Sequence, residues 1–166
     1  MCGDLHGGAQ EQHVPPHAYI NDVQLSPNEV QNKICQARTG LILSEIEGAC
    51  FASSEYLLCG VPVVSTRSHG GRDAWYNDYN SIVCEPTPED VAMAVRKIAS
   101  NPPNPERVRE QHIVLTNFFR ANFVSMLQML FDQNGVSESA HAYFKRNFIH
   151  KMRDSISPEF DSLFSW

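Results

Sequence analysis

The sequence has too little positive charge to attract nucleic acid through its overall field. It contains 13 lysine and arginine residues against 19 aspartate and glutamate residues, which gives a formal net charge of −6. Proteins that hold phosphate backbones through their global charge carry the opposite excess. The composition therefore predicts no nucleic-acid partner.

Long apolar runs are also missing. The longest nearly pure one covers residues 56–64, is too short to span a bilayer and is interrupted by Gly60 and Pro62. The chain does not open with a charged segment followed by an apolar one, so no secretory signal is expected. The 5 cysteines are spread out, as expected of small buried residues in a reducing compartment. We expect a cytoplasmic protein without a transmembrane segment.

Several common site signatures do not occur in the sequence. It has no Gly-x-Ser-x-Gly elbow, no P-loop and no dinucleotide-binding fingerprint. Four residues near the N-terminus have spacings that a zinc site could use, namely Cys2, His6, His13 and His17. Because this segment is rich in loop-forming residues and its cysteine adjoins the first methionine, we predict no metal site, and no cofactor.

Short apolar runs alternate with helical segments in the middle of the chain. Strands are expected at residues 40–44, 61–66 and 81–85, where the sequence is apolar and rich in β-branched residues. Strands that alternate with helices form parallel sheets covered on both faces. The sequence thus predicts an α/β fold, a partial Rossmann-like parallel sheet with flanking helices, followed by a C-terminal α-helical tail.

Helix starts and ends are marked by capping residues. Ser26 and Glu29 form the pattern of a capping box, and Thr87 caps a later helix in the same way. Another helix is expected to begin near Cys50 and to end at Gly60, because glycine readily takes the left-handed conformation that terminates helices.

The tail has a different character. Prolines in residues 101–105 end the preceding helix and mark a boundary. A long amphipathic helix with an aromatic face is expected over residues 115–131, and a second helix over residues 139–155. We predict three parts: an incomplete, loop-like N-terminal segment (1–17), a sheet domain (18–100) and C-terminal helices (101–166). Because a sheet of three strands is small, we expect further elements upstream or on another chain.

Two acidic residues flank the helix start that follows the first strand. Glu47 lies in the loop and Glu55 lies on the helix, and each carboxylate can accept hydrogen bonds from two adjacent hydroxyls. The carboxyl edge of a parallel sheet is where such folds bind ligands, and a helix N-terminus favours phosphate. The pattern suits a ligand with sugar, diphosphate and ribose in a row. Acidic residues also favour the first turn of any helix, so spacing alone leaves both interpretations open.

A longer pattern surrounds this pair of glutamates, which are separated by seven residues. The string CGVPVVST follows them, and then Gly70 and Gly71. A final group of positions continues the pattern, namely Asn80, Val83, Pro86, Glu89 and Val95. In this order of motifs, the segment from about Ser26 to Ile98 resembles the C-terminal domain of group 1 retaining glycosyltransferases with the GT-B fold, whose hallmark is the pair of glutamates.

The resemblance implies that residues 18–100 bind a nucleotide-sugar and that a glycosyl group is transferred, with retention, to an unknown acceptor. By position, Glu47 is the catalytic candidate and would contact hydroxyls of the transferred sugar, while Glu55 would bind the ribose. Gly48 and the backbone N–H groups of Cys50 and Phe51 would approach the sugar or the phosphates. Because the acceptor would attack from the side of the leaving diphosphate, Glu47 is not expected to be a covalent nucleophile.

The sequence departs from the family in two ways. The family commonly has Gly-Phe-Gly after the first glutamate, where this chain has Gly48, Ala49 and Cys50. The arginine and lysine that clamp the diphosphate in the family lie upstream of any residue of this chain. The nearest candidates for phosphate or loop contacts are Arg38, Arg67, Gly70, Gly71 and Arg72.

The resemblance also implies an N-terminal partner domain that binds the acceptor. The aromatic face of the C-terminal helices would pack on that domain or mediate self-association, since monomers rarely expose large apolar patches. Three alternatives to a transferase stay open: a non-catalytic remnant that binds nucleotide-sugars, a purely structural subunit, and one half of a sugar-nucleotide epimerase or phosphorylase.

Overall fold

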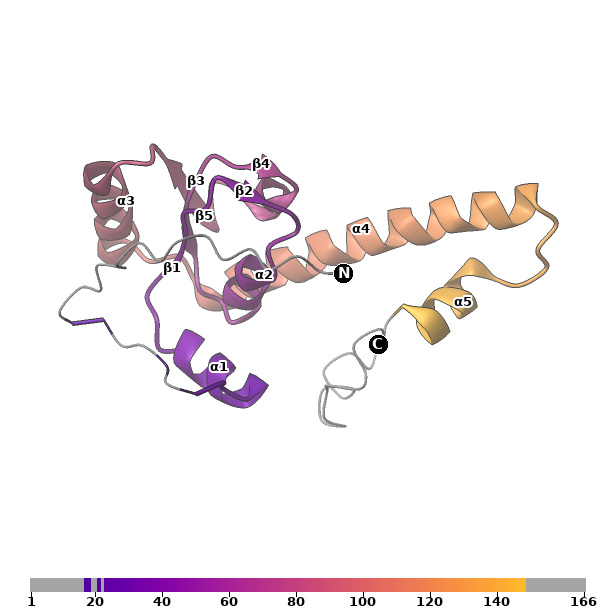
Figure 1. Cartoon of the computed structure of the whole chain (residues 1–166), viewed down its shortest axis with the longest axis horizontal. Coiled ribbons are helices and arrows are strands. Elements are labelled where there is room, and N and C mark those ends of the chain that lie inside the picture. The colour runs from indigo at the N-terminus through magenta and orange to yellow at the C-terminus, as the bar shows by residue number, and fades with distance from the viewer. Residues whose placement is uncertain (1–16, 19–20, 22, 149–166) are drawn as a thin grey trace, which may run out of the picture.

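A three-stranded parallel sheet lies at the centre of the computed structural model, which describes residues 17, 18, 21 and 23–148. Its strands are β1 (Gly40–Ile42), β3 (Val63–Thr66) and β5 (Ser81–Cys84), in the order β1-β3-β5 (Figure 1). Gly40 pairs with Val63, which in turn pairs with Ser81, so the three strands begin in register. The predicted α/β fold with a parallel sheet is confirmed.

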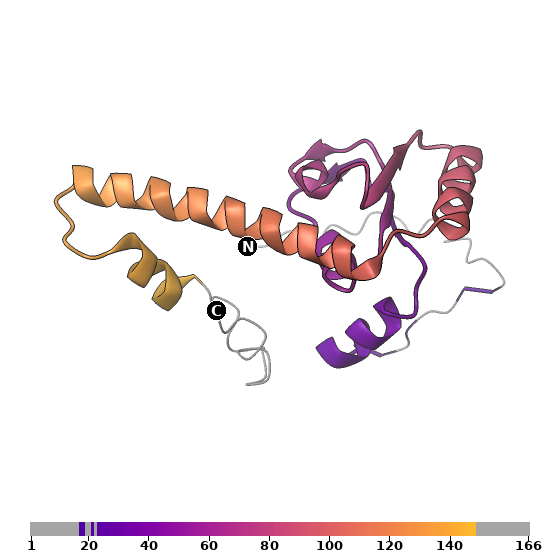
Figure 2. The same ribbon diagram turned by 180° about the vertical axis from the view of Figure 1, so that it is seen from behind.

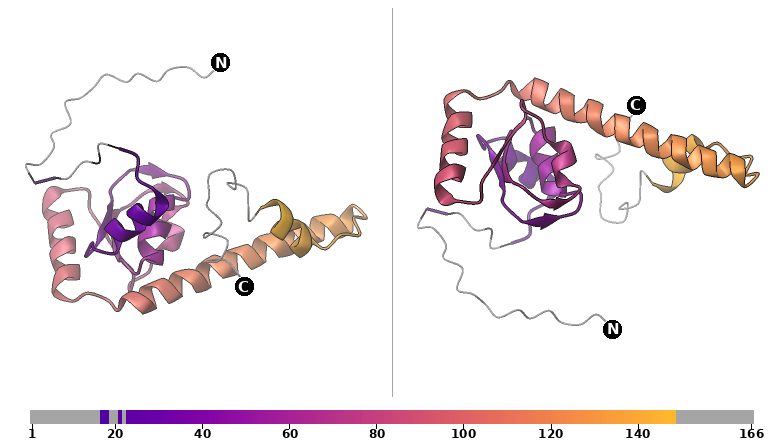
Figure 3. Two further views of the ribbon diagram at one scale, coloured as in Figure 1. Left: turned by 90° about the horizontal axis from the view of Figure 1, so that it is seen from below. Right: turned by 90° about the horizontal axis from the view of Figure 1, so that it is seen from above.

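Helices cover both faces of this sheet. On one face, α2 (Phe51–Leu58) and the first turns of α4 (Pro105–Gln133) enclose a core of Ile42, Leu57, Val63 and Val108. On the other face, α3 (Pro88–Ser100) packs Ala94 and Ile98 against Val64. Figure 3 shows α3 and α4 on different sides of the strands. The alternation of side chains along β3 therefore serves two separate cores, as parallel strands require.

The predicted caps are present. Helix α1 (Pro27–Ile34) begins with the capping box, in which the Glu29 carboxylate accepts the Ser26 backbone N–H at 2.8 Å. The Thr87 hydroxyl accepts the Asp90 N–H at the start of α3. Gly60 follows the end of α2 with φ +75°, the left-handed conformation expected of a glycine at that position.

A second sheet, made of only two very short strands, was not predicted. Strand β2 (Ile46–Glu47) pairs in parallel with β4 (His69–Gly70), and the 3₁₀ helix η1 (Arg72–Trp75) follows directly. Strands of two residues are too short to show alternation, so no pattern could have indicated the pairing.

Helix α4 extends well beyond the sheet domain, and α5 (Ala140–Asn147) folds back along its outer half (Figure 2). Aromatic rings hold the two together: Phe123 meets Phe144 with centroids 5.8 Å apart, and Phe131 meets Tyr143 at 5.4 Å. The predicted amphipathic helix and the start of the second helix are confirmed. The second helix is shorter than predicted, because α5 ends at Asn147, and residues 149–155 of the predicted helix lie outside the described residues.

Within the described part of the chain, α4 alone is long and apolar enough to cross a membrane by length and composition. Length and composition are weak evidence for one helix, and Arg120, near the middle of α4, donates a hydrogen bond to Asn117 on the same helix. A cation at the centre of a membrane-spanning helix costs about 2.5–3.5 kcal/mol. The absence of a transmembrane segment stays a prediction.

His112 is a buried polar side chain in the core of the sheet domain. It lies on α4 with 1% of its surface exposed, and its ring meets the Trp75 ring edge-on at 5.3 Å. Neither ring nitrogen has a hydrogen-bond partner. Burial lowers the pKa of His112 to about 4 because the charged imidazolium would lose its hydration.

This lowered pKa predicts that the fold loses stability in mild acid. The unfolded chain, in which the histidine titrates near its ordinary value, binds more protons between pH 6.5 and pH 4. His112 therefore leaves stability intact above pH 6.5 and lowers it as the pH falls toward 4. We expect a loss of about 2 kcal/mol between pH 7 and pH 5. The free energy of unfolding of the wild type and of His112→Leu is measured by urea denaturation at pH 7 and pH 5. The contribution of His112 is the difference between the two proteins in how much this free energy falls.

The matched control is His141→Leu, because His141 is exposed on α5 and should leave the slope of the wild type unchanged. Equal slopes for wild type and His112→Leu would contradict the prediction.

Candidate functional site

The candidate site lies at the carboxyl edge of the parallel sheet. Strand β1 leads through Ser44 into β2, which carries Glu47, and α2 begins four residues later at Phe51. Glu55 follows on the same helix and is exposed. The structure thus brings Glu47, Gly48, Cys50 and Phe51 to one short connection between a strand and a helix N-terminus, the position at which α/β folds bind ligands.

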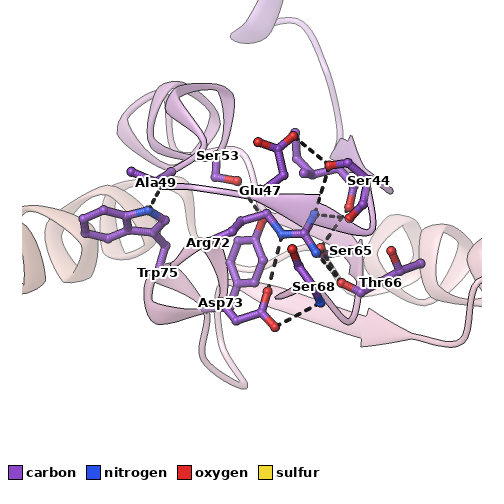
Figure 4. Close-up of polar contacts among 12 residues, drawn as sticks. Ser44, Glu47, Ala49, Ser53, Ser65, Thr66, Ser68, Arg72, Asp73 and Trp75 are labelled. Carbon is purple, nitrogen blue, oxygen red and sulfur yellow. Dashed lines mark hydrogen bonds and ion pairs between the residues drawn. The ribbon is translucent and has the colours of Figure 1, made fainter. Parts of the chain in front are cut away.

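The Glu47 carboxylate is held in place from one side. Its side chain is half-buried, and the Ser44 hydroxyl donates a hydrogen bond to Oε1 at 2.7 Å (Figure 4). A carboxylate has about four acceptor positions, so most of them, including those on Oε2, are left for other donors.

Cys50 has the backbone of a glycine. It is the only described residue other than glycine with positive φ, at +47°, and its side chain makes no capping hydrogen bond to α2. A left-handed conformation costs a residue with a side chain about 1–2 kcal/mol. The backbone shape expected of glycine at this position is therefore retained despite the substitution, and the first N–H groups of α2 are not used by a side-chain cap.

Gly70 is required by the close approach of β4 to β2, whereas Gly71 is not. A Cβ atom added to Gly70, whose φ is +134°, would lie 1.8 Å from the backbone oxygen of Glu47. A Cβ added to Gly71 would lie 3.4 Å from the Gly48 oxygen. Gly70 thus allows β4 to pack against the backbone of the Glu47 segment. Contact of Gly70 or Gly71 with a ligand stays a prediction.

Arg72 is completely buried beneath this segment. Its Nη1 donates to the Ser44 backbone oxygen at 2.8 Å and to the Ser44 hydroxyl at 3.2 Å, and Nη2 donates to the Thr66 backbone oxygen. Nε faces Asp73 Oδ1 at 3.4 Å. The guanidinium therefore ties together the ends of β1 and β3. Sequence reasoning placed Arg72 among the candidate phosphate contacts, whereas the structure directs its donors to protein oxygens.

Residues 23–113 match the family of group 1 glycosyl transferases. The matched region is more than half of the chain and contains β1 to β5, α1 to α3 and the first turns of α4. The chain belongs to the group 1 glycosyltransferases. This membership supports the transfer of glycosyl groups in general. Curated proteins and solved structures give no significant match.

The other basic candidates of this group 1 glycosyltransferase lie at different edges of the sheet. Arg67 directly follows β3, is exposed and lies at the carboxyl edge with Glu47. Arg38 precedes β1, which places it toward the amino edge, and it is not brought to the site. Arg67 is thus the better placed of the two exposed arginines to contact a phosphate at this edge.

Sequence reasoning missed two residues of the glycosyltransferase site. Ser44 was interpreted only as a strand end, although a hydroxyl three residues before a carboxylate could have drawn attention to it. Trp75, on η1, donates from its indole N–H to the Ala49 oxygen at 2.6 Å and packs its ring against Phe119 of α4. Trp75 and Ala49 are 26 positions apart in the sequence, so no local pattern indicates their contact.

The zinc hypothesis is not settled by the structure. Cys2, His6 and His13 lie outside the described residues. In the part of the chain that is described, no group of three histidine, cysteine or acidic side chains could hold a metal ion. The absence of a metal site in this transferase stays a prediction.

Proposed function

We propose that this chain binds a nucleotide-sugar at the carboxyl edge of its sheet and transfers the sugar, with retention, to an acceptor. Glu47 contacts hydroxyls of the transferred sugar, and Glu55 binds the ribose. The observation that carries the proposal is the Glu47 carboxylate, fixed by Ser44 immediately before the N-terminus of α2. The family match supports the transfer of glycosyl groups in general.

The chemistry of each position fits its proposed partner. With one hydrogen bond from Ser44, the Glu47 carboxylate can still accept hydrogen bonds from two neighbouring sugar hydroxyls. The first N–H groups of α2, near Cys50 and Phe51, point toward the same edge and suit the diphosphate. Glu55 lies one turn further along α2 and is exposed to solvent, so its carboxylate can accept hydrogen bonds from the two ribose hydroxyls.

The proposed role of the protein in the reaction is electrostatic. In a transfer with retention in which the acceptor attacks beside the departing diphosphate, the main requirement is stabilisation of charge on the leaving group. The helix N-terminus supplies part of it, and Arg67 is the exposed cation at this edge. Glu47 serves as a sugar-binding residue and not as a covalent nucleophile.

The acceptor site belongs to an N-terminal domain that packs beside β1. Strand β1 is an edge of the sheet, and Leu41 within it and Leu43 directly after it are 47% and 45% exposed. Strands of parallel sheets are normally covered on both faces, so this flank suits a further strand or helix. The exposed apolar side chains of α4, including Phe118 and Met129, suit the same domain or a second copy of the chain.

A non-catalytic module that binds nucleotide-sugars is the second candidate. It is favoured by the burial of Arg72, which leaves Arg67 as the one exposed member of the predicted arginines at the carboxyl edge. A single cation is enough to help bind a diphosphate, but it stabilises less of the charge that develops when the diphosphate leaves during transfer.

Calorimetric titration tests the binding site. Three probes are used, UDP-glucose, GDP-mannose and ADP-glucose, each beside its free nucleoside diphosphate. We expect Glu55→Gln to weaken both members of the bound pair about tenfold, since hydrogen bonds to a charged group contribute about 1.5–3 kcal/mol. Glu47→Gln should weaken only the nucleotide-sugar by a similar factor, because the free diphosphate lacks the transferred sugar.

Glu45→Gln is the matched control, since Glu45 is exposed in the same connection two residues before Glu47. It should leave both affinities unchanged. Failure of all three pairs to bind the wild type would overturn the proposed site. Binding of a nucleotide-sugar without release of its diphosphate, in the presence of an acceptor extract, would favour the non-catalytic module.

A further inference from the structure

We infer that Ser44 and Arg72 are positioning residues that fix the Glu47 carboxylate for the sugar. The inference rests on the proposed function, because it assigns to Glu47 the role given above. It adds two residues that contact no ligand themselves and act through Glu47.

The direction of the hydrogen bonds follows from the groups involved. A guanidinium can only donate, so the bond of 3.2 Å between Arg72 Nη1 and Ser44 Oγ must use a lone pair of the hydroxyl. The single hydroxyl hydrogen of Ser44 is then free to be donated, and Glu47 Oε1 at 2.7 Å accepts it. A carboxylate can only accept when it is ionised. The chain of donors therefore runs one way, from Arg72 through Ser44 to Glu47.

The start of this chain is rigid. Arg72 is 0% exposed, and its other donors are directed to the Ser44 and Thr66 backbone oxygens and to Asp73. Asp73 in turn accepts the Ser68 N–H at 3.4 Å, which anchors it to the turn after β3. Figure 4 shows the guanidinium lying between Ser44 and Thr66, at the ends of β1 and β3.

The same 3₁₀ helix also holds the other end of the Glu47 segment. Trp75 lies three residues after Arg72 on η1 and binds the Ala49 oxygen at 2.6 Å. Arg72 thus acts before Glu47, through Ser44, and Trp75 acts after it, through Ala49. A carboxylate fixed before the ligand arrives spares the complex the cost of ordering that side chain.

Removal of the Ser44 hydroxyl tests this inference. Calorimetry is carried out on Ser44→Ala with the three nucleotide-sugars and the three free diphosphates used above. We expect the affinity for the bound nucleotide-sugar to fall about fivefold to tenfold and that for its diphosphate to stay within twofold. Ser44→Thr, which keeps a hydroxyl, should restore the affinity, and Ser100→Ala, remote on α3, should change neither. Equal losses for both ligands would mean general damage and would overturn the inference.

A second measurement needs no ligand and therefore separates this inference from the proposed function. Amide hydrogen exchange over residues 44–50 is followed by mass spectrometry. We expect exchange about tenfold faster in Ser44→Ala and in Arg72→Lys, and unchanged in Ser44→Thr and Ser100→Ala. If the wild type binds no nucleotide-sugar, the proposed function fails and the exchange result still decides the positioning. Unchanged exchange in Ser44→Ala would overturn it.

Discussion

Replacement of Arg72 by methionine is expected to lower the free energy of unfolding by about 3–5 kcal/mol. Methionine can fill much of the volume, but it cannot donate to the Ser44 and Thr66 backbone oxygens that the guanidinium now binds. Exchange of a buried ion pair for apolar residues can be neutral when both partners are replaced. Here two of the partners are backbone carbonyls, which no substitution removes. Urea denaturation monitored by circular dichroism measures the effect.

Arg67→Met is the matched control for this prediction. Arg67 directly follows β3, the strand whose Thr66 oxygen Arg72 binds, but it is exposed. Its replacement should therefore change the free energy of unfolding by no more than about 0.5 kcal/mol. An Arg72→Met protein as stable as the wild type would show that water satisfies the two carbonyls, and that the buried arginine is not what joins β1 to β3.

The elements that sequence alone predicted are those with local causes. The capping box of Ser26 and Glu29, the Thr87 cap and the left-handed Gly60 each depend on residues within one turn of one another. The β-branched composition of β3 reflects burial on both faces of the sheet. Such features are written in a few adjacent residues, and the structure confirms them.

The parts of the site that sequence could not predict depend on contacts between distant residues. Arg72 and Ser44 are separated by 28 positions and Trp75 and Ala49 by 26. An arginine beside a glycine pair is usually a solvated side chain, and burial of this one follows only from the pairing of β2 with β4. The sequence therefore indicated a candidate site, but not which residues hold the Glu47 carboxylate within it.

Cys50 departs from the family pattern and still takes the left-handed backbone conformation that glycine favours. It stands where the family commonly has glycine, and its φ is +47°. The surrounding structure imposes this conformation: Trp75 fixes the preceding carbonyl of Ala49, and the Cys50 side chain packs against the core beneath α2. A local strain of this kind persists only where neighbouring contacts determine it, and such strain is common at functional sites.

Replacement of Gly70 by alanine is expected to cost about 3 kcal/mol of stability and to displace the Glu47 segment. The new Cβ would lie 1.8 Å from the Glu47 backbone oxygen, and a φ of +134° is strained for any residue with a side chain. Because the obstructing atom belongs to the backbone, no side-chain rotation can relieve the overlap, and β2 must separate from β4. Urea denaturation measures the cost, and amide exchange over residues 44–50 reports the separation.

The glycines around the site provide a graded control. A Cβ on Gly48 meets no atom within 4 Å, and one on Gly71 meets the Gly48 oxygen at 3.4 Å. The free energy of unfolding should therefore fall little in Gly48→Ala, slightly more in Gly71→Ala and most in Gly70→Ala. Equal effects at Gly48 and Gly70 would mean that these substitutions act through the flexibility of the unfolded chain. The predicted order instead means that position 70 needs glycine because two backbones are in contact there. The backbone of Glu47 can lie against β4 only if residue 70 has no side chain.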